Sequence, residues 1–322
     1  MRALSGVQPS GKLHIGNYFG AIRQYVQLQQ EHEGFFFIAN YHALTTIRNA
    51  EEMRQQTLDL AADYLALGLD PDRATIFLQS DVPQVTELTW ILSTVTPMGL
   101  LERCHAYKDK VAQGLPADHG LFAYPTLMAA DILIYDSNLV PVGQDQKQHV
   151  EVTRDIGERF NNTYGDTLVI PEAYILKDTA TVVGVDGRKM SKSYDNTICI
   201  FDPEKQVRKQ IMSIVTDSTP LEAPKAPDEC SVYAIYALFA DEAHQQQMAD
   251  RYRAGGLGYG EAKQELFRQF MEYFGEARKR REQLAQDPGY VVEVLKQGAA
   301  KAGDIAQQTI ARVREACGVN IG

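Results

Sequence analysis

The sequence predicts an α/β protein with a parallel β-sheet in its N-terminal part and a helical domain after it. Short apolar runs at residues 34–39 and 74–78 have the length and composition of strands buried on both faces. Between them, Asn49 is a good helix cap and Gly68 a helix end, which predicts a strand–helix–strand unit. After about residue 195, helical patterns continue with little strand signal. In such a sheet, a nucleotide binds at the carboxyl ends of the strands.

The first element is a strand that ends in a glycine-bearing turn before a helix. Residues 4–18 contain Pro9, Gly11 and Gly16, where the backbone can turn sharply and approach a ligand closely. Helical spacing follows from Phe19 onward. A helix N-terminus offers unpaired N–H groups and the positive end of the helix dipole, so the turn is typical of a phosphate site. An ordinary strand-to-helix turn has the same pattern.

The remaining elements follow in order along the chain. Residues 83–107 have a helical pattern in which Trp90 is expected to pack in the core. The later predictions are a polar loop at 108–120, a helix at 121–135, a strand at 138–143, a helix that ends near residue 160, and helices from about 195 to 322.

Composition and charge limit the function classes. With 322 residues, 44% of them hydrophobic, the chain can form two folded domains. Its net charge of −10 means that RNA contacts must use local basic patches, because phosphate neutralisation drives such binding. The four cysteines form no Cys-x-x-Cys pair, so we expect no metal site and mostly buried, reduced thiols. Without a signal core or an apolar run of about 18 residues, we expect a soluble cytoplasmic protein without membrane contact.

A second polar segment follows a Val-rich run. Residues 187–193 read Gly-Arg-Lys-Met-Ser-Lys-Ser and place Lys189 and Lys192 beside two hydroxyl groups. Two flexible ammonium groups next to hydroxyls suit a developing polyphosphate charge better than a core. Taken alone, a solvated basic loop has the same composition.

Four motifs together resemble the class I aminoacyl-tRNA synthetases, and within that class the bacterial tryptophanyl-tRNA synthetases. They are His-Ile-Gly-Asn at 14–17, Tyr-Pro-Thr-Leu-Met-Ala-Ala-Asp-Ile-Leu at 124–133, Val-Pro-Val-Gly-Gln-Asp-Gln-Lys-Gln-His at 140–149 and Lys-Met-Ser-Lys-Ser at 189–193. The resemblance extends over essentially the whole chain. It implies a Rossmann-like catalytic domain at 1–195, a helical tRNA- and anticodon-binding domain at 196–322, and a homodimer to which residues 83–107 contribute.

The resemblance also implies a two-step reaction. The carboxylate of L-tryptophan attacks the α-phosphorus of ATP, bound with Mg²⁺, and tRNA(Trp) then takes the aminoacyl group from the adenylate. Neither step needs an enzyme nucleophile, because the protein contributes positioning and charge stabilisation. The sequence agrees, since it has no Gly-x-Ser-x-Gly and no His-Glu-x-x-His pattern and no predicted metal cage.

By resemblance, an ATP site and its catalytic groups can be assigned. His14 would face the triphosphate, and Lys189 and Lys192 would hold the departing pyrophosphate. Lys108 is a candidate third phosphate contact, with Lys110 as its rival, although each lysine alone is equally typical of a solvated surface. The full predicted ATP-binding set, with the ribose contacts at 143–145, is Gln8, Pro9, Ser10, Gly16, Asn17, Gly143, Gln144, Asp145, Val182, Lys189, Met190, Ser191, Lys192 and Ser193.

Asp131 is the residue that favours tryptophan as the amino acid. It lies in an otherwise apolar helical run, where an acid is either a surface charge or a placed acceptor. An indole has a single donor-only N–H, for which a carboxylate is the natural partner. Met128 would press on the indole ring as a deformable thioether. Tyr124, Gln146 and Gln8 are candidates for the α-amino and carboxylate ends, and His42 for the pocket wall, although a core histidine is nearly as common.

Basic clusters in the helical domain are candidates for tRNA contacts, and three other functions compete with the leading prediction. Residues 278–281, and Lys205 with Arg208 and Lys209, are the best patches for tRNA, although a solvated helix face explains each equally well. The nearest rival is the tyrosine-specific relative, which shares the fold and both signatures. A smaller nucleotidyltransferase would lack the lysine segment and the helical domain, and a silent RNA-binding paralogue would have lost His14 or the lysines.

Overall fold

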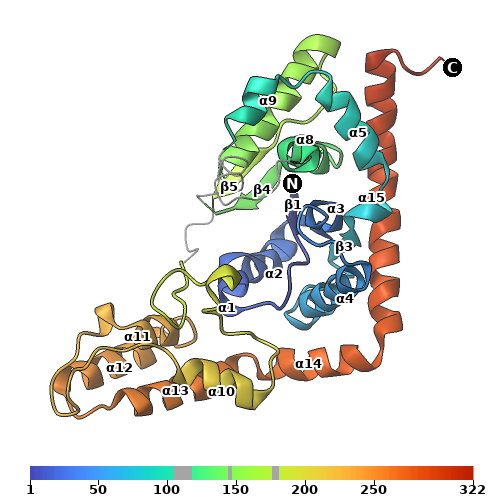
Figure 1. Ribbon diagram of the computed structural model, residues 1–322. Coiled ribbons are helices and arrows are strands. Elements are labelled where there is room, and N and C mark those ends of the chain that lie inside the picture. Colours follow the sequence, from blue (N-terminus) through green and yellow to red (C-terminus); the bar gives the residue numbers. More distant parts are fainter. Residues whose placement is uncertain (105–117, 144–146, 176–180, 322) are drawn as a thin grey trace. The chain divides into compact units, whose positions relative to one another are not determined.

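A computed structural model describes residues 1–104, 118–143, 147–175 and 181–321, and Figure 1 shows its helices and strands. The strands are β1 (Arg2–Val7), β2 (Glu33–Ile38), β3 (Ala74–Leu78), β4 (Leu139–Val142) and β5 (Glu172–Ile175). They form one parallel sheet in the order β3-β2-β1-β4-β5. The predicted α/β class is confirmed, and β5 is a strand that the sequence analysis missed.

The helices of the first half lie largely where they were predicted. They are α1 (Ile15–Asn17), the π-helical η1 (Tyr18–Ile22), α2 (Arg23–Glu31), α3 (Asn40–Ala43), α4 (Ala50–Ala66), the 3₁₀ turn η2 (Gln79–Asp81), α5 (Gln84–Ser93), α6 (Met98–Glu102), α8 (His119–Leu133) and α9 (Lys147–Tyr164). Asn49 caps α4 as expected, since its side-chain oxygen accepts from the N–H groups of Glu51 and Glu52. The helical pattern predicted for residues 83–107 corresponds to two helices in its described part, α5 and α6, and Pro97 separates them because proline disfavours helical backbone in the preceding residue.

The second half is helical in its described residues. It contains the 3₁₀ turns η4 (Lys192–Tyr194) and η5 (Pro227–Glu229) and the helices α10 (Glu204–Met212), α11 (Ser231–Tyr236), α12 (Glu242–Ala254), α13 (Tyr259–Tyr273), α14 (Gly275–Gln286) and α15 (Pro288–Cys317).

The chain divides into two compact units. The sheet unit comprises Met1–Gly11, Tyr25–Lys177 and Asp287–Gly322, and the helical unit comprises Lys12–Gln24 and Asp178–Gln286. This division differs from the predicted boundary between residues 195 and 196, because α15 packs against β3, α4 and α5 and residues 12–24 group with the helical unit. The functions assigned to residues 1–195 and 196–322 stay predictions.

Both faces of the sheet are covered by packed side chains. On one face Leu4, Phe35 and Phe77 belong to a core shared with α5, α8, α9 and α15. On the other face Phe36 stacks on Tyr25, with 4.8 Å between the ring centroids. Successive side chains of a strand point to opposite faces, so the continuous apolar run of β2 supplies both layers.

Helix α15 lies against the edge strand β3 (Figure 1). Its buried residues recur at helical spacing, and Gly298 stands where helix and strand approach most closely. A Cβ atom at Gly298 would lie 1.9 Å from the carbonyl oxygen of Ile76. Only glycine allows this contact, by which the helix covers an edge that would otherwise be open to another strand.

The structure contradicts the burial predicted for the single tryptophan and confirms the burial predicted for most of the cysteines. The expected core position of Trp90 is wrong, because 71% of the residue is exposed on α5. The cysteines are free thiols, and three of them, Cys104, Cys199 and Cys230, are buried as expected. In the described part of the chain, no helix has both the length and the apolar character that a membrane crossing requires.

The close approach at Gly298 can be tested by substitution. Gly298→Ala should lower the free energy of unfolding by about 2–4 kcal/mol, because the added methyl group forces α15 away from β3. Gly303→Ala, in the same helix with open space around the new Cβ, should raise it by about 0.5–1 kcal/mol. Urea unfolding of both variants measures the difference, and equal effects would contradict the close contact.

Candidate active site

Asp131 lies on α8 as a buried carboxyl group with three hydrogen-bond contacts. The residue is 1% exposed. Its carboxylate accepts from His42 Nε2 at 2.8 Å and from Gln79 Nε2 at 2.8 and 2.9 Å. Burial raises the pKa of Asp131 above its ordinary value, while the bonds from His42 and Gln79 act in the opposite direction. His42 and Asp131, which were predicted separately as tryptophan-binding residues, are therefore in direct contact.

Gln79 is a site residue that the sequence analysis missed. It is 1% exposed and lies in η2, directly after β3, at the carboxyl end of the strand. Its side-chain oxygen accepts from the N–H of Tyr41 in α3 at 2.9 Å, and its nitrogen donates to Asp131. The available signal was its position, since a polar residue that follows a buried strand of a parallel sheet lies at the edge where ligands bind.

Tyr124 connects His42 to α9. Its ring meets that of His42 edge-to-face, with centroids 6.2 Å apart, and its hydroxyl lies 3.1 Å from His149 Nε2. Burial raises the pKa of Tyr124 to about 12. His149 closes the third quoted motif, but no role was predicted for it.

A cavity of about 600 Å³ adjoins this cluster within the sheet unit. Two predicted tryptophan-binding residues, His42 and Tyr124, line it, and His42 in turn contacts Asp131, which is not among the lining residues. The lining residues are Tyr41, His42, Leu44, Thr45, Thr46, Arg48, Thr86, Thr89, Asp118, Gly120, Leu121, Ala123, Tyr124 and Leu127. Met128 is half-buried and packs against the core of the sheet unit.

The first signature lies in the helical unit. Residues 13–15 pair with residues 198–200, and the Ile15 N–H donates to the Ile198 carbonyl at 3.0 Å. His14, just before α1, is 5% exposed. Burial, with the nearby charge of Lys192, lowers the pKa of His14 to about 4. Its imidazole is therefore neutral at pH 7.

Met190 of the second signature lies beside the first. A Cβ atom at Gly16 would lie 2.9 Å from His14 Nδ1 and 3.5 Å from the Cβ of Met190. Asn17 accepts from the His14 backbone N–H at 3.2 Å. His14 Nδ1 is buried and has no hydrogen-bond partner among the described residues. A buried nitrogen without a partner is typical of a site that a ligand completes.

The lysine segment is one arm of a hairpin. The Met190 N–H donates to the Val182 carbonyl at 2.8 Å, and both side chains are buried. Gly187 makes the turn with φ +83°, a left-handed conformation that favours glycine. The side chains of Lys189 and Lys192 are exposed, so the hairpin buries its apolar residues and presents its cations.

Asn196 holds this hairpin and was missed as a site residue. It is 1% exposed and accepts from the Ser191 N–H at 2.7 Å. Its amide donates to Asp186 Oδ1 at 2.7 Å and to the Lys189 carbonyl at 3.1 Å. The hydroxyl oxygens of Ser191 and Ser193 are 2.8 Å apart. A single asparagine after a motif carries no periodic signal in sequence.

The remaining predicted residues are divided among the units and the undescribed segments. Pro9 is buried, whereas Gln8 and Ser10 are exposed, and all three belong to the sheet unit. Gly143 directly follows β4 at its carboxyl end. Lys108, Lys110, Gln144, Asp145 and Gln146 lie outside the described residues. Within the described ranges, no three metal-ligating side chains form a cluster.

Comparisons with known proteins agree with these features. A family model for class I tRNA synthetases (W and Y) matches residues 1–275. The tryptophan–tRNA ligase of Fusobacterium nucleatum is 56% identical over 319 residues, covering 99% of this chain and 98% of that protein. The ligase of Rhodopirellula baltica is 55% identical, covering 99% and 100%. The crystal structure of Campylobacter jejuni tryptophanyl-tRNA synthetase complexed with ADP and tryptophan is 53% identical, with a TM-score of 0.94 over 99% of this chain and 100% of that one.

The lowered pKa of His14 predicts acid sensitivity. The unfolded chain binds this proton near pH 6.5, whereas the folded chain binds it near pH 4. Stability should therefore fall as the pH drops between these values, by up to about 3 kcal/mol. His14→Gln should remove this part of the pH dependence, and the exposed His119→Gln should not. Urea unfolding at several pH values tests this, and parallel pH profiles for wild type and His14→Gln would contradict it.

Proposed function

The chain belongs to the class I tRNA synthetases of the tryptophan and tyrosine group and has the activity of a tryptophan–tRNA ligase, and we propose which of its residues act in each step of that reaction. It activates L-tryptophan with ATP to tryptophanyl-adenylate and pyrophosphate, and then transfers tryptophan to tRNA(Trp). The observation that carries the assignment of residues is the buried carboxylate of Asp131, held by His42 and Gln79.

Asp131 is proposed as the acceptor of the indole N–H. The indole donates and cannot accept, so its partner must be an acceptor that stays ionised in an apolar surrounding. The donors on Asp131 favour the charged form against the effect of burial. Met128 and His42 would line the ring, and Tyr124 would contact the α-amino or carboxylate end. Gln8 and Gln146 are proposed for the same polar end of the substrate.

His14 and the lysine hairpin are proposed to act on ATP. A neutral imidazole can donate a hydrogen bond to a phosphate oxygen, and the exposed ammonium groups of Lys189 and Lys192 can follow the charge that develops on the departing pyrophosphate. Because the oxygen-rich triphosphate carries its own Mg²⁺, no protein cage is needed, and the metal is part of the substrate. The other proposed ATP contacts are Gln8, Pro9, Ser10, Gly16, Asn17, Gly143, Gln144, Asp145, Val182, Met190, Ser191 and Ser193, with Lys108 as a further catalytic contact.

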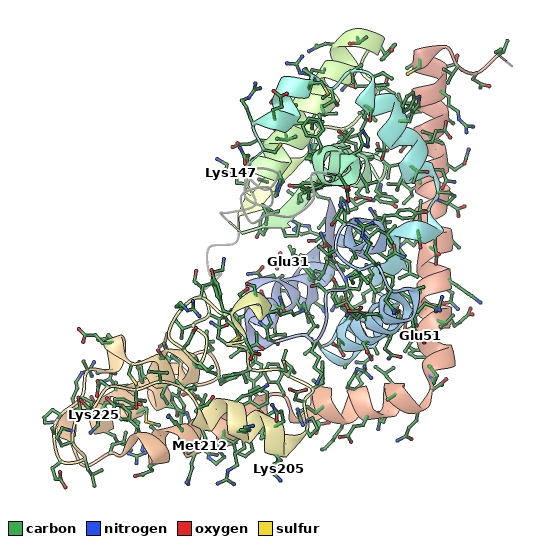
Figure 2. All side chains as sticks on the ribbon, viewed as in Figure 1. Glu31, Glu51, Lys147, Lys205, Met212 and Lys225 are labelled. Carbon is green, nitrogen blue, oxygen red and sulfur yellow. The ribbon has the colours of Figure 1, made fainter. Side chains whose placement is uncertain are left out.

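We propose that tRNA contacts use the exposed cations of the helical unit. Lys205 and Lys209 are exposed on α10, and Lys205 projects away from the ribbon (Figure 2). Arg280 is exposed on α14, whereas Arg278 holds the chain together, since its guanidinium donates to the Asp202 carbonyl at 2.8 Å and to that of Ile200. The basic cluster at residues 278–281 therefore offers fewer cations to tRNA than its sequence indicates. Anticodon binding by residues 196–322 is part of this proposal.

We also propose that the chain forms a homodimer through α5 and α6 and that it is located in the cytoplasm. Trp90 is 71% exposed and Met98 62% exposed, and both belong to the sheet unit. Large exposed apolar side chains are typical of a surface that a partner covers. The free cysteines suit a reducing compartment.

Asp131→Asn tests the amino-acid assignment. ATP–pyrophosphate exchange with each of the twenty amino acids should depend on tryptophan in the wild type. The variant should lose about 100-fold or more in kcat/KM for tryptophan, because an uncharged amide replaces an ionised acceptor. The KM for ATP should be unchanged.

Asp166→Asn removes an exposed carboxylate and should leave the exchange unaffected. Exchange with tyrosine instead of tryptophan would move the chain to the sister specificity. Equal tryptophan kinetics in Asp131→Asn and the wild type would remove Asp131 from the pocket.

Lys192→Ala tests the role of the lysine hairpin. Because its charge is needed mainly when pyrophosphate departs, kcat for exchange should fall by about 10²–10³ with a small change in the KM for ATP. The exposed Lys296→Ala on α15 is the matched control. A rise in KM with unchanged kcat would assign Lys192 to ground-state binding.

A further inference from the structure

The amide of Gln79 is the centre of a fully buried contact among three elements. From η2, after β3, it reaches the start of α3 and the last turn of α8. Its oxygen is 2.9 Å from the Tyr41 backbone nitrogen, and its nitrogen is 2.8 Å from one Asp131 oxygen and 2.9 Å from the other. Gln79 and Asp131 are each 1% exposed.

The chemistry of the neighbours fixes which way this amide points. The Tyr41 backbone N–H can only donate, so it must face the amide oxygen of Gln79. The NH₂ group is then turned toward Asp131, which in its ionised form can only accept. The reversed amide would set donor against donor at Tyr41 and acceptor against acceptor at Asp131. The contact with Tyr41 therefore makes the Gln79 side chain a hydrogen-bond donor to Asp131.

His42 supplies the other protein donor to the same carboxylate. In the ionised form that its proposed role requires, Asp131 accepts, and His42 Nε2, at 2.8 Å, then carries its hydrogen. A carboxylate has about four acceptor positions. One N–H of Gln79 is shared between the two carboxylate oxygens, and His42 Nε2 donates to one of them. Among the described residues no other donor bonds to this carboxylate, so an acceptor position remains for a ligand with a single donor.

We propose that Gln79 is the positioning residue for tryptophan specificity: its amide fixes the orientation of the Asp131 carboxylate so that the remaining acceptor position meets the indole N–H. This rests on the proposed role of Asp131. The glutamine itself touches no substrate. It acts by preventing the carboxylate from rotating to use its acceptor positions elsewhere, so that the carboxylate itself is already oriented when it meets the indole.

The role predicts a specific kinetic signature. The bond to the indole N–H is present both before and during adenylate formation, so weakening it should raise the KM for tryptophan and leave kcat nearly unchanged. A purely structural role would instead lower the active fraction, and hence the apparent kcat. The signature also depends on the N–H itself, because a ring without that donor gains nothing from an oriented carboxylate.

Gln79→Met is the test variant, because methionine keeps the length of the side chain and removes the amide N–H donors. ATP–pyrophosphate exchange is measured with tryptophan and with β-(3-benzothienyl)alanine, in which sulfur replaces the indole N–H. The wild type should prefer tryptophan by about 100-fold or more in kcat/KM, and the variant should lose about tenfold of that preference. The ratio of the two substrates within one preparation is independent of how much enzyme is folded.

Thr75→Val is the matched control, since Thr75 is buried in β3 and its hydroxyl has no hydrogen-bond partner among the described residues. It should keep the wild-type ratio. If Gln79→Met is insoluble, Gln79→Asn gives the same test, because an amide one methylene shorter cannot span Tyr41 and Asp131. An unchanged ratio in either soluble Gln79 variant would overturn the proposal and leave the ligase activity standing. Absence of tryptophan-dependent exchange in the wild type would overturn the role of Asp131 as well.

Discussion

The burial of one carboxyl group, that of Asp131, is the constraint on which the sheet unit depends. A carboxyl group that is 1% exposed must have hydrogen-bond partners in place of its lost water. Those partners come from η2 and α3, the segments that follow β3 and β2. The carboxyl group on α8 thus ties the carboxyl ends of two neighbouring strands to one helix. The order of the parallel sheet, with β2 beside β3, is what places His42 and Gln79 together.

The two compact units handle charge in opposite ways. In the sheet unit the Asp131 carboxyl group is buried, and its proposed ligand is the neutral N–H of an indole. In the helical unit the cations of Lys189 and Lys192 are exposed, while the neighbouring imidazole of His14 is buried and kept neutral by its lowered pKa. An exposed ammonium group keeps much of its hydration. The buried carboxyl group of the sheet unit is thus held by fixed hydrogen bonds, whereas the two lysine cations of the helical unit lie at the surface.

Sequence reasoning predicted the elements and the signatures well, because both depend on local patterns. Buried parallel strands are continuous apolar runs, so β2 and β3 were found nearly to the residue, and Asp131 stood out against its apolar helix. Trp90 was wrongly expected in the core, because apolarity alone does not separate a core from a surface that a partner covers. The grouping of α15 with the sheet could not be predicted either, since a helical pattern shows which face is apolar but not what it packs against.

The residues that were missed share one physical property. Gln79 and Asn196 are single buried amides, and each joins segments through both its donor and its acceptor. An amide can serve both roles at once without carrying charge, which is why it suits a junction between a backbone N–H and a carboxylate or carbonyl group. No spacing in the sequence marks such a junction, because the partners come from different elements. Residues that position a reactive side chain are therefore visible only once the packing of those elements is known.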